Sequence, residues 1–381
     1  MSVIPTRPAR TVRTMRHDPN ERPFIVIWEV TRACALACAH CRADAIRARN
    51  PLELTTVEGF RLLDRIAAFG TPRPIVVLTG GDPFERPDLP ELVRYGTGIG
   101  LHVALSPSVT PRLTEPVLRE LHDAGATAVS LSLDGATAAG HDGFRGIDGV
   151  FDRTLQAART VKDVGYRLQI NTTVTAGNAH ELPDILATVV DLGASLWSVF
   201  FLVPTGRGSR LGPLDPAGVE DVLHWLHDVG DQVAIKTTEA PHFRRVALQR
   251  AAGTVHRPGP LGERLRVATS ASGGVRTRPA RPPMDVNAGR GFAFIDHLGD
   301  VYPSGFLPVV AGSVREQHFD DIYRTSPVMR ALRDPDGFGG KCGLCEYRQV
   351  CGGSRSHAYA VTGDLLAADP ACVYEPSATR D

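Results

Sequence analysis

The chain has 381 residues, and hydrophobic residues make up 43% of them, enough for one large domain with a packed core and a smaller second one. Lysine plus arginine and aspartate plus glutamate each total 42, so the formal net charge is zero and nothing indicates a nucleic-acid-binding surface. No apolar run reaches the roughly 18 residues that a membrane-spanning helix needs. The sequence therefore predicts neither nucleic acid nor a membrane as a partner.

The start of the chain, residues 1–22, carries arginines and prolines but no apolar segment of the kind found in signal peptides. We expect this segment to be a mobile tail. The 7 cysteines of the chain fall into one group near the start and another near the end. An odd total in tight local groups is poor for disulfides and typical of metal sites. Metal clusters held by thiolates predict a reducing compartment, the cytoplasm.

The first predicted strand, Phe24–Val30, is rich in β-branched and aromatic residues. Cys34, Cys38 and Cys41 follow it within a few residues, where an α/β barrel keeps its chemistry. A Cys-x3-Cys-x2-Cys loop can bind three irons of a [4Fe–4S] cube, which normally takes four cysteines, and so leaves one iron open to a small chelating ligand. The alternative is a zinc site that includes His40. This histidine lies between two of the cysteines, without room to reach the same ion.

Strands and helices then alternate along the chain. After a helix that opens on a capping box at Thr55, further strands are predicted over Ile75–Thr79, His102–Ser106, Ala128–Leu133, Leu168–Val174 and Leu196–Val203. Six strand units separated by helices predict a parallel sheet with right-handed crossovers. Because no seventh or eighth unit is evident, we expect an α/β fold with a partial (β/α)6 barrel of the TIM type.

The ends of these strands carry small and polar residues, as expected for a site on the top face of a barrel. Gly80 and Gly81 would let a ligand approach bare backbone after the second strand, and Asp82 follows them. The later strand ends supply these further candidates: Ser132, Arg145, Asn171, Thr173 and Val203. Each one alone could be a turn or strand-end residue. Their occurrence at successive strand ends supports a shared binding site.

Past the sixth strand the pattern loosens. A strand predicted over Gln232–Thr237 precedes a short segment that contains His242, Arg244 and Arg245. Two adjacent arginines with a histidine could bind substrate carboxylates, or they could be a solvated helix start. Residues 253–283 are rich in Gly, Pro, Ser and Arg without apolar periodicity, which predicts a mobile loop that could act as a lid.

The last part of the chain begins with a predicted hairpin whose turn lies near Leu298-Gly-Asp300. The remaining cysteines follow it, at Cys342, Cys345, Cys351 and Cys372. Close pairs with one distant cysteine predict a metal site that ties the end of the chain back onto the fold. A four-cysteine set with a Cys-x2-Cys pair can hold an iron–sulfur cluster or a structural zinc ion.

The stretch from Trp28 to Cys41 resembles the signature of the radical S-adenosylmethionine (SAM) superfamily. The resemblance implies that SAM binds the open iron, and that an electron from the cluster splits it into methionine and a 5′-deoxyadenosyl radical that abstracts hydrogen from a substrate. It also implies an electron donor such as flavodoxin or ferredoxin. Gly80-Gly-Asp-Pro83 resembles the family's Gly-Gly-Glu-Pro position for the SAM amino group, with aspartate in place of glutamate.

The same resemblance implies further contacts with SAM. Ser132 would reach its carboxylate or ribose, and Arg145 would bind its carboxylate through a fork of donors. Asn171 and Thr173 would contact the ribose, and the backbone at Val203 would meet the adenine edge.

Residues 286–375 resemble the SPASM domain, a C-terminal module of radical SAM enzymes that mature peptides or tetrapyrroles. The last four cysteines match the ligands of its outer auxiliary cluster, whereas relatives carry inner-cluster cysteines where this chain has Ser304 and Ser354. The resemblance therefore implies one auxiliary [4Fe–4S] cluster. The expected division is a tail over 1–22, the barrel over 23–210, a bridging segment with a mobile loop over 211–285, the SPASM-like domain over 286–375, and a tail over 376–381.

Along the whole chain, the sequence motifs most resemble those of SPASM proteins related to the radical SAM enzymes of alternative haem and haem d1 biosynthesis. This implies a radical SAM oxidoreductase or maturase that acts on a peptide or a tetrapyrrole-like substrate, in maturation or in cofactor or natural-product biosynthesis. A non-catalytic iron–sulfur or zinc scaffold is the alternative from another class. Cleavage of SAM by the reduced protein separates the two classes.

Overall fold

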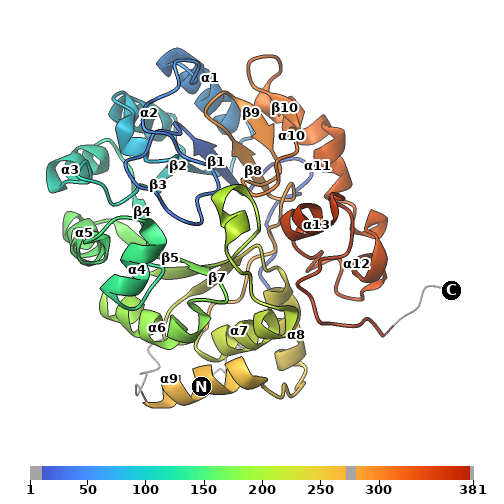
Figure 1. Cartoon of the computed structure of the whole chain (residues 1–381). Helices are drawn as coiled ribbons and strands as arrows, with labels where there is room; N and C mark the ends of the chain where they lie inside the picture. Colours follow the sequence, from blue (N-terminus) through green and yellow to red (C-terminus); the bar gives the residue numbers. More distant parts are fainter. Residues whose placement is uncertain (1–10, 272–279, 378–381) are drawn as a thin grey trace, which may run out of the picture.

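The computed structural model describes residues 11–271 and 280–377. Its framework is a 10-stranded sheet in the order β10-β9-β8-β1-β2-β3-β4-β5-β6-β7 (Figure 1). The parallel part consists of β1 (Ile25–Glu29), β2 (Ile75–Thr79), β3 (His102–Leu105), β4 (Ala128–Ser132), β5 (Arg167–Val174), β6 (Leu196–Phe201) and β7 (Ile235–Thr238). Because these strands are parallel, their carboxyl ends meet at one edge of the sheet.

Helices cover the outer face of these strands (Figure 1). They are α1 (Thr56–Ala67), α2 (Leu89–Gly98), α3 (Glu115–Asp123), α4 (Ala138–Arg145), α5 (Val150–Val164), α6 (Leu182–Asp191) and α7 (Pro216–Asp228). Side chains alternate along each strand, so one set packs beneath the helices. On β6, the buried Trp197 meets Trp225 of α7 edge-on, with ring centroids 6.1 Å apart. Among the described residues, none of the helices combines the length and apolar character needed to cross a membrane.

The predicted partial barrel is confirmed, and its sheet continues past six strands. β7 pairs with β6 inside the segment expected to bridge two domains, and β8 (Phe292–Ile295) pairs in parallel with β1. Each is only 4 residues long, so their membership of the barrel sheet is not evident from the sequence. Within residues 11–271 and 280–377, no strand pair joins β7 to β8, so the barrel is open on this side.

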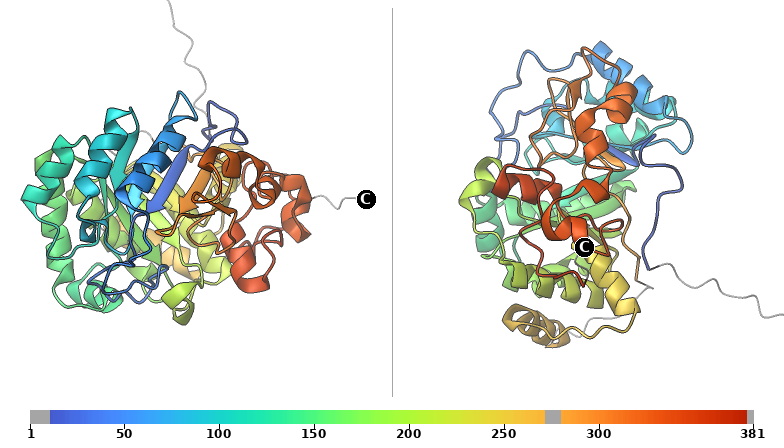
Figure 2. Two further views of the ribbon diagram at one scale, coloured as in Figure 1. Left: turned by 90° about the horizontal axis from the view of Figure 1, so that it is seen from above. Right: turned by 90° about the vertical axis from the view of Figure 1, so that its right-hand side faces the viewer.

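The C-terminal part packs on one side of the barrel, next to β1 (Figure 2). β9 (Asp300–Tyr302) pairs antiparallel with β8, which confirms the predicted hairpin, and β10 (Gly312–Ser313) extends it. The helices that follow are α10 (Phe319–Thr325), α11 (Pro327–Ala331), α12 (Gly340–Leu344) and α13 (Arg355–Thr362).

Helix α9 (Pro260–Ala271) lies where the sequence predicts a mobile loop over 253–283. It packs against α7, since Trp225 Nε1 donates a 2.9 Å hydrogen bond to Thr269 Oγ1. The prediction of a loop was wrong for this helix, because a few contacts suffice to hold a polar helix against a neighbour. The part of the predicted loop over 272–279 lies outside the described residues.

The segment 11–22 is also held in place. Arg13 Nε donates to the Pro282 carbonyl at 2.8 Å, and Tyr323 Oη donates to the Pro19 carbonyl at 2.6 Å. The predicted mobile tail is therefore wrong for this segment, which contacts residues that follow it by more than 250 positions. The rest of the predicted tail lies outside the described residues.

Arg244 links α8 (His242–Ala251) to the cysteine-bearing segment. Its guanidinium donates to the carbonyls of Val350, Met284 (3.0 Å), Val286 (2.8 Å) and Cys351 (3.0 Å). The Arg244 side chain is 5% exposed, so water has little access to replace it as the hydrogen-bond donor to these carbonyls. A single cation thus joins three separate stretches of backbone.

We expect Arg244→Met to lower the free energy of unfolding by about 3–5 kcal/mol, because it leaves buried carbonyls without a donor. Urea denaturation of the purified protein measures this loss. The matched control is Arg264→Met on α9, whose side chain is exposed and should change the unfolding midpoint little. Equal midpoints for the two variants would contradict the role given to Arg244.

Candidate active site

The loop with Cys34, Cys38 and Cys41 follows β1 at the carboxyl edge of the sheet. Each thiol accepts one N–H donor: Leu36 N lies 3.3 Å from Cys34 Sγ, Arg145 Nη1 lies 3.6 Å from Cys38 Sγ, and Ala45 N lies 3.5 Å from Cys41 Sγ. Such donors stabilise thiolates that bind iron. The residues therefore fit an iron–sulfur cluster held by this loop.

Gly80 and Gly81 press against the backbone that leads into the cysteine loop. A Cβ on Gly80 would lie 2.4 Å from the Thr31 carbonyl oxygen, and one on Gly81 would lie 2.4 Å from that of Ala33. Gly81 N donates to Thr31 O at 2.9 Å, and Asp82 N donates to Ala33 O at 2.7 Å. The two glycines are required for this close approach, whatever contact they make with a ligand.

Asp82 is fully buried and organises its own loop. Its carboxylate accepts hydrogen bonds from Thr110 Oγ1 at 2.7 Å and from the backbone N–H groups of Phe84 and Ser108 at 3.2 and 3.4 Å. Burial raises the pKa of Asp82 to about 6, and these hydrogen bonds oppose the rise only in part. The structure thus gives Asp82 a role in ordering the loop, and a contact with SAM remains a prediction.

Two of the predicted SAM residues line one cavity of about 250 Å³ beside the cysteine loop. Ser132 and Arg145 lie on its wall together with Ser108 and Leu36. Arg145 also forms a buried ion pair with Asp134. The Asp134 carboxylate accepts a further hydrogen bond from Thr173 N at 2.6 Å. This ion pair fixes the arginine between Cys38 and the cavity.

Asp134 was not among the site residues predicted from the sequence. Burial is the largest single influence and works against the ionised form, but Arg145, the neighbouring histidines and the Thr173 N–H together lower the pKa of Asp134. The aspartate is therefore ionised and holds the guanidinium by charge. An aspartate two residues past a strand-end serine was the available signal, but its partner on α4 cannot be found from spacing alone.

The other predicted SAM residues lie along β5 and after β6. Asn171 Oδ1 accepts a hydrogen bond from Gln169 Nε2 at 2.7 Å. The Thr173 side chain is partly exposed, and the Val203 carbonyl accepts a bond from Thr205 N at 2.8 Å. Their contacts with ribose and adenine stay predictions.

A buried charged group beside Cys41 was missed by sequence reasoning. Glu29, at the end of β1, forms ion pairs with Arg42 and with His297, which follows β8. The Arg42 guanidinium also lies 4.4 Å from the centre of the Phe294 ring. Burial is the largest single influence and opposes the charge on Glu29, but Arg42 and His297 together lower the pKa of Glu29. This group joins the cysteine loop to the open side of the barrel.

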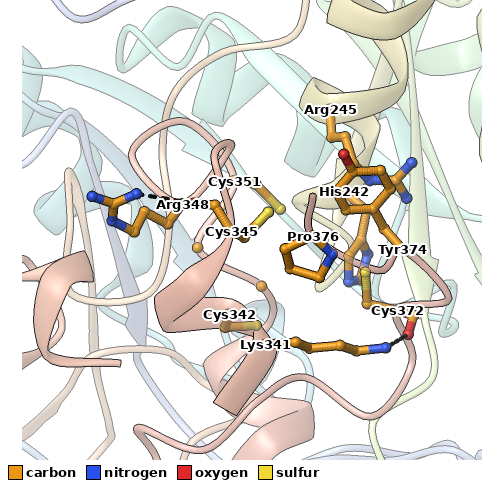
Figure 3. Close-up of a pocket in the computed structure, with 12 residues that line it drawn as sticks. His242, Arg245, Lys341, Cys342, Cys345, Arg348, Cys351, Cys372, Tyr374 and Pro376 are labelled. Carbon is orange, nitrogen blue, oxygen red and sulfur yellow. Dashed lines mark hydrogen bonds between the residues drawn. The ribbon is translucent and has the colours of Figure 1, made fainter. Parts of the chain in front are cut away.

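The four C-terminal cysteines line a second pocket of about 340 Å³ (Figure 3). Cys342, Cys345 and Cys351 come from the segment around α12, and Cys372 comes from the end of the chain. The distant cysteine therefore returns to the same site, as the spacing predicts. Lys341 Nζ holds that returning segment by donating to the Cys372 carbonyl at 2.6 Å.

The four thiols that line this pocket are a ligand set for an iron–sulfur cluster. Four cysteines that include a Cys-x2-Cys pair are also a ligand set for a structural zinc ion. The residues present therefore fit an iron–sulfur cluster, and measurement of the bound metal distinguishes it from zinc.

His242, Arg244 and Arg245, the predicted substrate candidates, lie against this second pocket. His242 Nε2 is 2.9 Å from Asp369 Oδ2, and His242 lines the pocket together with Cys372. Arg245 forms an ion pair with Glu220, with nitrogen–oxygen distances of 2.8 and 2.5 Å. Both arginines are engaged with protein acceptors, so these contacts do not support their binding of substrate carboxylates.

Ser304 and Ser354 meet at one carboxylate. Ser304 Oγ donates to Glu239 Oε1 at 2.9 Å, and Ser354 Oγ donates to Glu239 Oε2 at 2.5 Å. Glu239 follows β7 with a φ of 58°, which non-glycine residues rarely adopt. No sequence signal indicated this glutamate. A hydrogen-bonded acid thus joins the two serines at the positions where the SPASM resemblance predicts inner-cluster cysteines.

Asp82 predicts a defined dependence of stability on pH. Because the folded protein binds the Asp82 proton more tightly than the unfolded chain does, its contribution to stability is largest at low pH and falls as pH rises from about 4 to about 6. We expect the stability of the apo protein relative to Asp82→Asn to fall by about 3 kcal/mol across this range. Urea denaturation at matched pH values measures the difference.

The control is Asp163→Asn, a substitution of an exposed aspartate on α5. Its stability relative to the unmodified protein should show no such fall between pH 4 and 6. A difference for Asp82→Asn that does not change with pH would contradict the assignment.

Comparison with known proteins agrees with this geometry. The model of the radical SAM superfamily matches residues 28–189. An AdoMet-dependent heme synthase of Methanosarcina barkeri is 40% identical over 357 residues, which cover 93% of this chain and 97% of that protein. A pre-heme d1 synthase of Dinoroseobacter shibae is 30% identical over 366 residues, covering 91% of this chain and 85% of that protein.

Among solved structures, Streptococcus suis SuiB bound to its precursor peptide SuiA has a TM-score of 0.68 at 16% identity, covering 93% of this chain and 76% of that chain. At this identity the likeness concerns the fold. It extends over the barrel and the C-terminal part together. The chain therefore belongs to the radical SAM superfamily, whose enzymes use a [4Fe–4S] cluster and SAM, as a member with a SPASM-type C-terminal domain that is related to the haem-synthase group.

Proposed function

We propose that this enzyme acts on a tetrapyrrole in SAM-dependent haem formation, in the cytoplasm. The observation that carries the proposal is the 40% identity with the heme synthase over almost the full length of both proteins. The two groups of cysteines suited to bind iron–sulfur clusters support a reducing compartment. A reduced flavodoxin or ferredoxin is the proposed electron donor.

Haem carries two vinyl groups where iron coproporphyrin III carries two propionates. At each of these two side chains a C–H bond breaks, with its hydrogen atom passing to the 5′-deoxyadenosyl radical, and carbon dioxide leaves. One further electron is released at each side chain, and we propose the auxiliary cluster as its acceptor. Such a C–H bond is unreactive towards acids and bases. Bound SAM and its cluster would supply the radical chemistry needed, and the protein's part is to hold the substrate and exclude water. We therefore choose iron coproporphyrin III as the substrate to test.

The residues on the cavity wall support the placement of SAM beside the cysteine loop. Arg145 is held by Asp134 and reaches both Cys38 and the cavity, so it can offer its remaining donors to a carboxylate. Ser132 offers a hydroxyl on the same wall. Gly80 and Gly81 keep this wall in register with the cysteine loop through their close backbone approach.

A peptide substrate is the second candidate. A mycofactocin maturase of Mycobacterium tuberculosis is 30% identical over 373 residues, so peptide maturation occurs among the relatives of this chain. The lower identity places the tetrapyrrole first. Analysis of products by mass spectrometry distinguishes the two.

Substitutions in the two cysteine groups should have different effects on SAM cleavage. We expect about 8 irons per chain in anaerobically purified protein and about 4 in either Cys38→Ala or Cys372→Ser, because each variant loses one cube. Cys38→Ala should abolish formation of 5′-deoxyadenosine from SAM by the reduced protein. Cys372→Ser should retain this formation in the absence of substrate. Iron analysis and chromatography measure both quantities.

In this pair each variant is the control for the other. If both variants still cleave SAM, the assignment of the first cysteine group as the radical SAM cluster is contradicted. A stoichiometric zinc ion that is lost only in Cys372→Ser would contradict the second cluster.

The substrate proposal predicts that reduced protein, SAM and iron coproporphyrin III together yield haem and 5′-deoxyadenosine. Cys38→Ala is the control and should yield neither. Liquid chromatography with mass detection follows the porphyrin. SAM cleavage by the unmodified protein with no change in the porphyrin would reject haem formation while leaving the radical chemistry intact.

A further inference from the structure

A row of polar side chains crosses four neighbouring strands of the barrel. Ser132 of β4 is in register with Asn171 of β5, Asn171 with Ser198 of β6, and Ser198 with Lys236 of β7. Residues in register on adjacent strands point to the same face of a sheet. The four side chains therefore lie side by side on one face.

That face is the interior of the barrel. The neighbours of this row in sequence, Trp197 and Ile235, are in register with each other and buried. Trp197 packs against Trp225 of α7, which places this alternate set beneath the helices. Side chains alternate along a strand, so Ser198 and Lys236 point the other way. A lysine thus projects into the interior of the barrel.

Lys236 is one of three lysines in the chain. Its side chain is exposed, and the structure assigns its ammonium no hydrogen bond or ion pair with the residues it describes. Surrounding protein nevertheless desolvates the group and, together with the charge of Arg281, lowers the pKa of Lys236. The ammonium thus meets solvent but loses part of its hydration to the surrounding protein, so an anion beside it would stabilise its charged form.

The two ends of this polar row, Ser132 and Lys236, lie at different places inside the barrel. Ser132 lies on the wall of the cavity beside the cysteine loop, where SAM is proposed to bind. Lys236 lies three strand spacings away, about 14 Å along the sheet. A lysine side chain cannot span that separation, so its ammonium is available to a second ligand rather than to SAM.

The second ligand has a defined chemistry. A desolvated ammonium gains most from a carboxylate, which replaces lost water with a charge-assisted hydrogen bond. The hydroxyl of Thr238 lies 3.5 Å from that of Ser198, so the neighbouring interior positions of β6 and β7 are also polar. The aromatic side chain of Phe200 is in register with Thr238 and partly exposed on the same face.

We propose that Lys236 binds a carboxylate of the substrate inside the barrel, at the end of the polar row opposite SAM. This inference rests on the proposed function, in which the substrate is a tetrapyrrole with propionate side chains. Lys236 is a positioning residue here. It fixes one edge of the macrocycle so that another edge faces the cavity beside Cys38.

The test measures binding of iron coproporphyrin III by its absorbance change in anaerobic protein that carries both clusters. We expect Lys236→Met to weaken binding about 10- to 100-fold, and Lys236→Arg to restore most of it. The tetramethyl ester of the same porphyrin should bind the unmodified protein and Lys236→Met equally.

The matched control is Lys162→Met, a substitution of an exposed lysine on the outer helix α5, which should bind the porphyrin as the unmodified protein does. Equal affinity of the unmodified protein and Lys236→Met for the free acid would overturn the assignment of Lys236 alone. A loss of affinity for the ester as large as that for the acid would overturn it too, by showing a loss of shape rather than charge. Failure of the unmodified protein to bind the porphyrin would overturn the proposed function, and this inference with it.

Discussion

The contact between two backbones positions everything else in the proposed SAM site. The loop after β2 packs so tightly on the loop after β1 that no side chain fits at Gly80 or Gly81. Hydrogen bonds from Gly81 and Asp82 to Thr31 and Ala33 fix the register of the two loops. Because the cysteines follow directly, the thiols inherit a position set by the sheet. A rigid frame of this kind spares the protein the entropy of ordering a free loop around a cofactor.

Buried charges perform a similar function at longer range. Asp134 holds Arg145 against Cys38, and Glu29 holds Arg42 beside Cys41. Arg244 joins backbone carbonyls of the C-terminal part to α8. Arginine suits these positions because its planar fork stays charged and satisfies several acceptors at once. Some of the abundant arginines of this chain are therefore internal connectors rather than surface charges.

The sequence was most informative where the chemistry is local. The spacing of Cys34, Cys38 and Cys41 lies within one loop, and strand periodicity placed that loop at the edge of a barrel. The partners that complete the site come from far away in the chain: Glu29 and His297 are 268 positions apart. Periodicity and spacing carry no information about such pairs. For the same reason, nothing in the sequence indicated that Glu239 would receive hydrogen bonds from Ser304 and Ser354.

Where the sequence pattern allowed more than one interpretation, packing within the folded protein decided the outcome. The arginines of α8 were weighed as substrate ligands or as a solvated helix start, and the structure shows a third outcome, in which both are buried and paired within the protein. Helix α9 formed in a stretch without apolar periodicity because its contact with α7 comes from tertiary structure. Short strands such as β7 depend on the pairing offered by an existing sheet edge.

The carboxylate of Glu239 between two serine hydroxyls has a consequence for electrical conduction. Thiolate-bound irons can accept and pass on single electrons, whereas hydroxyls and a carboxylate cannot. The two hydroxyls and the carboxylate therefore offer no redox centre in this part of the molecule. Any electron that passed through this region would have to tunnel across it, and the rate of such a step would fall with the distance.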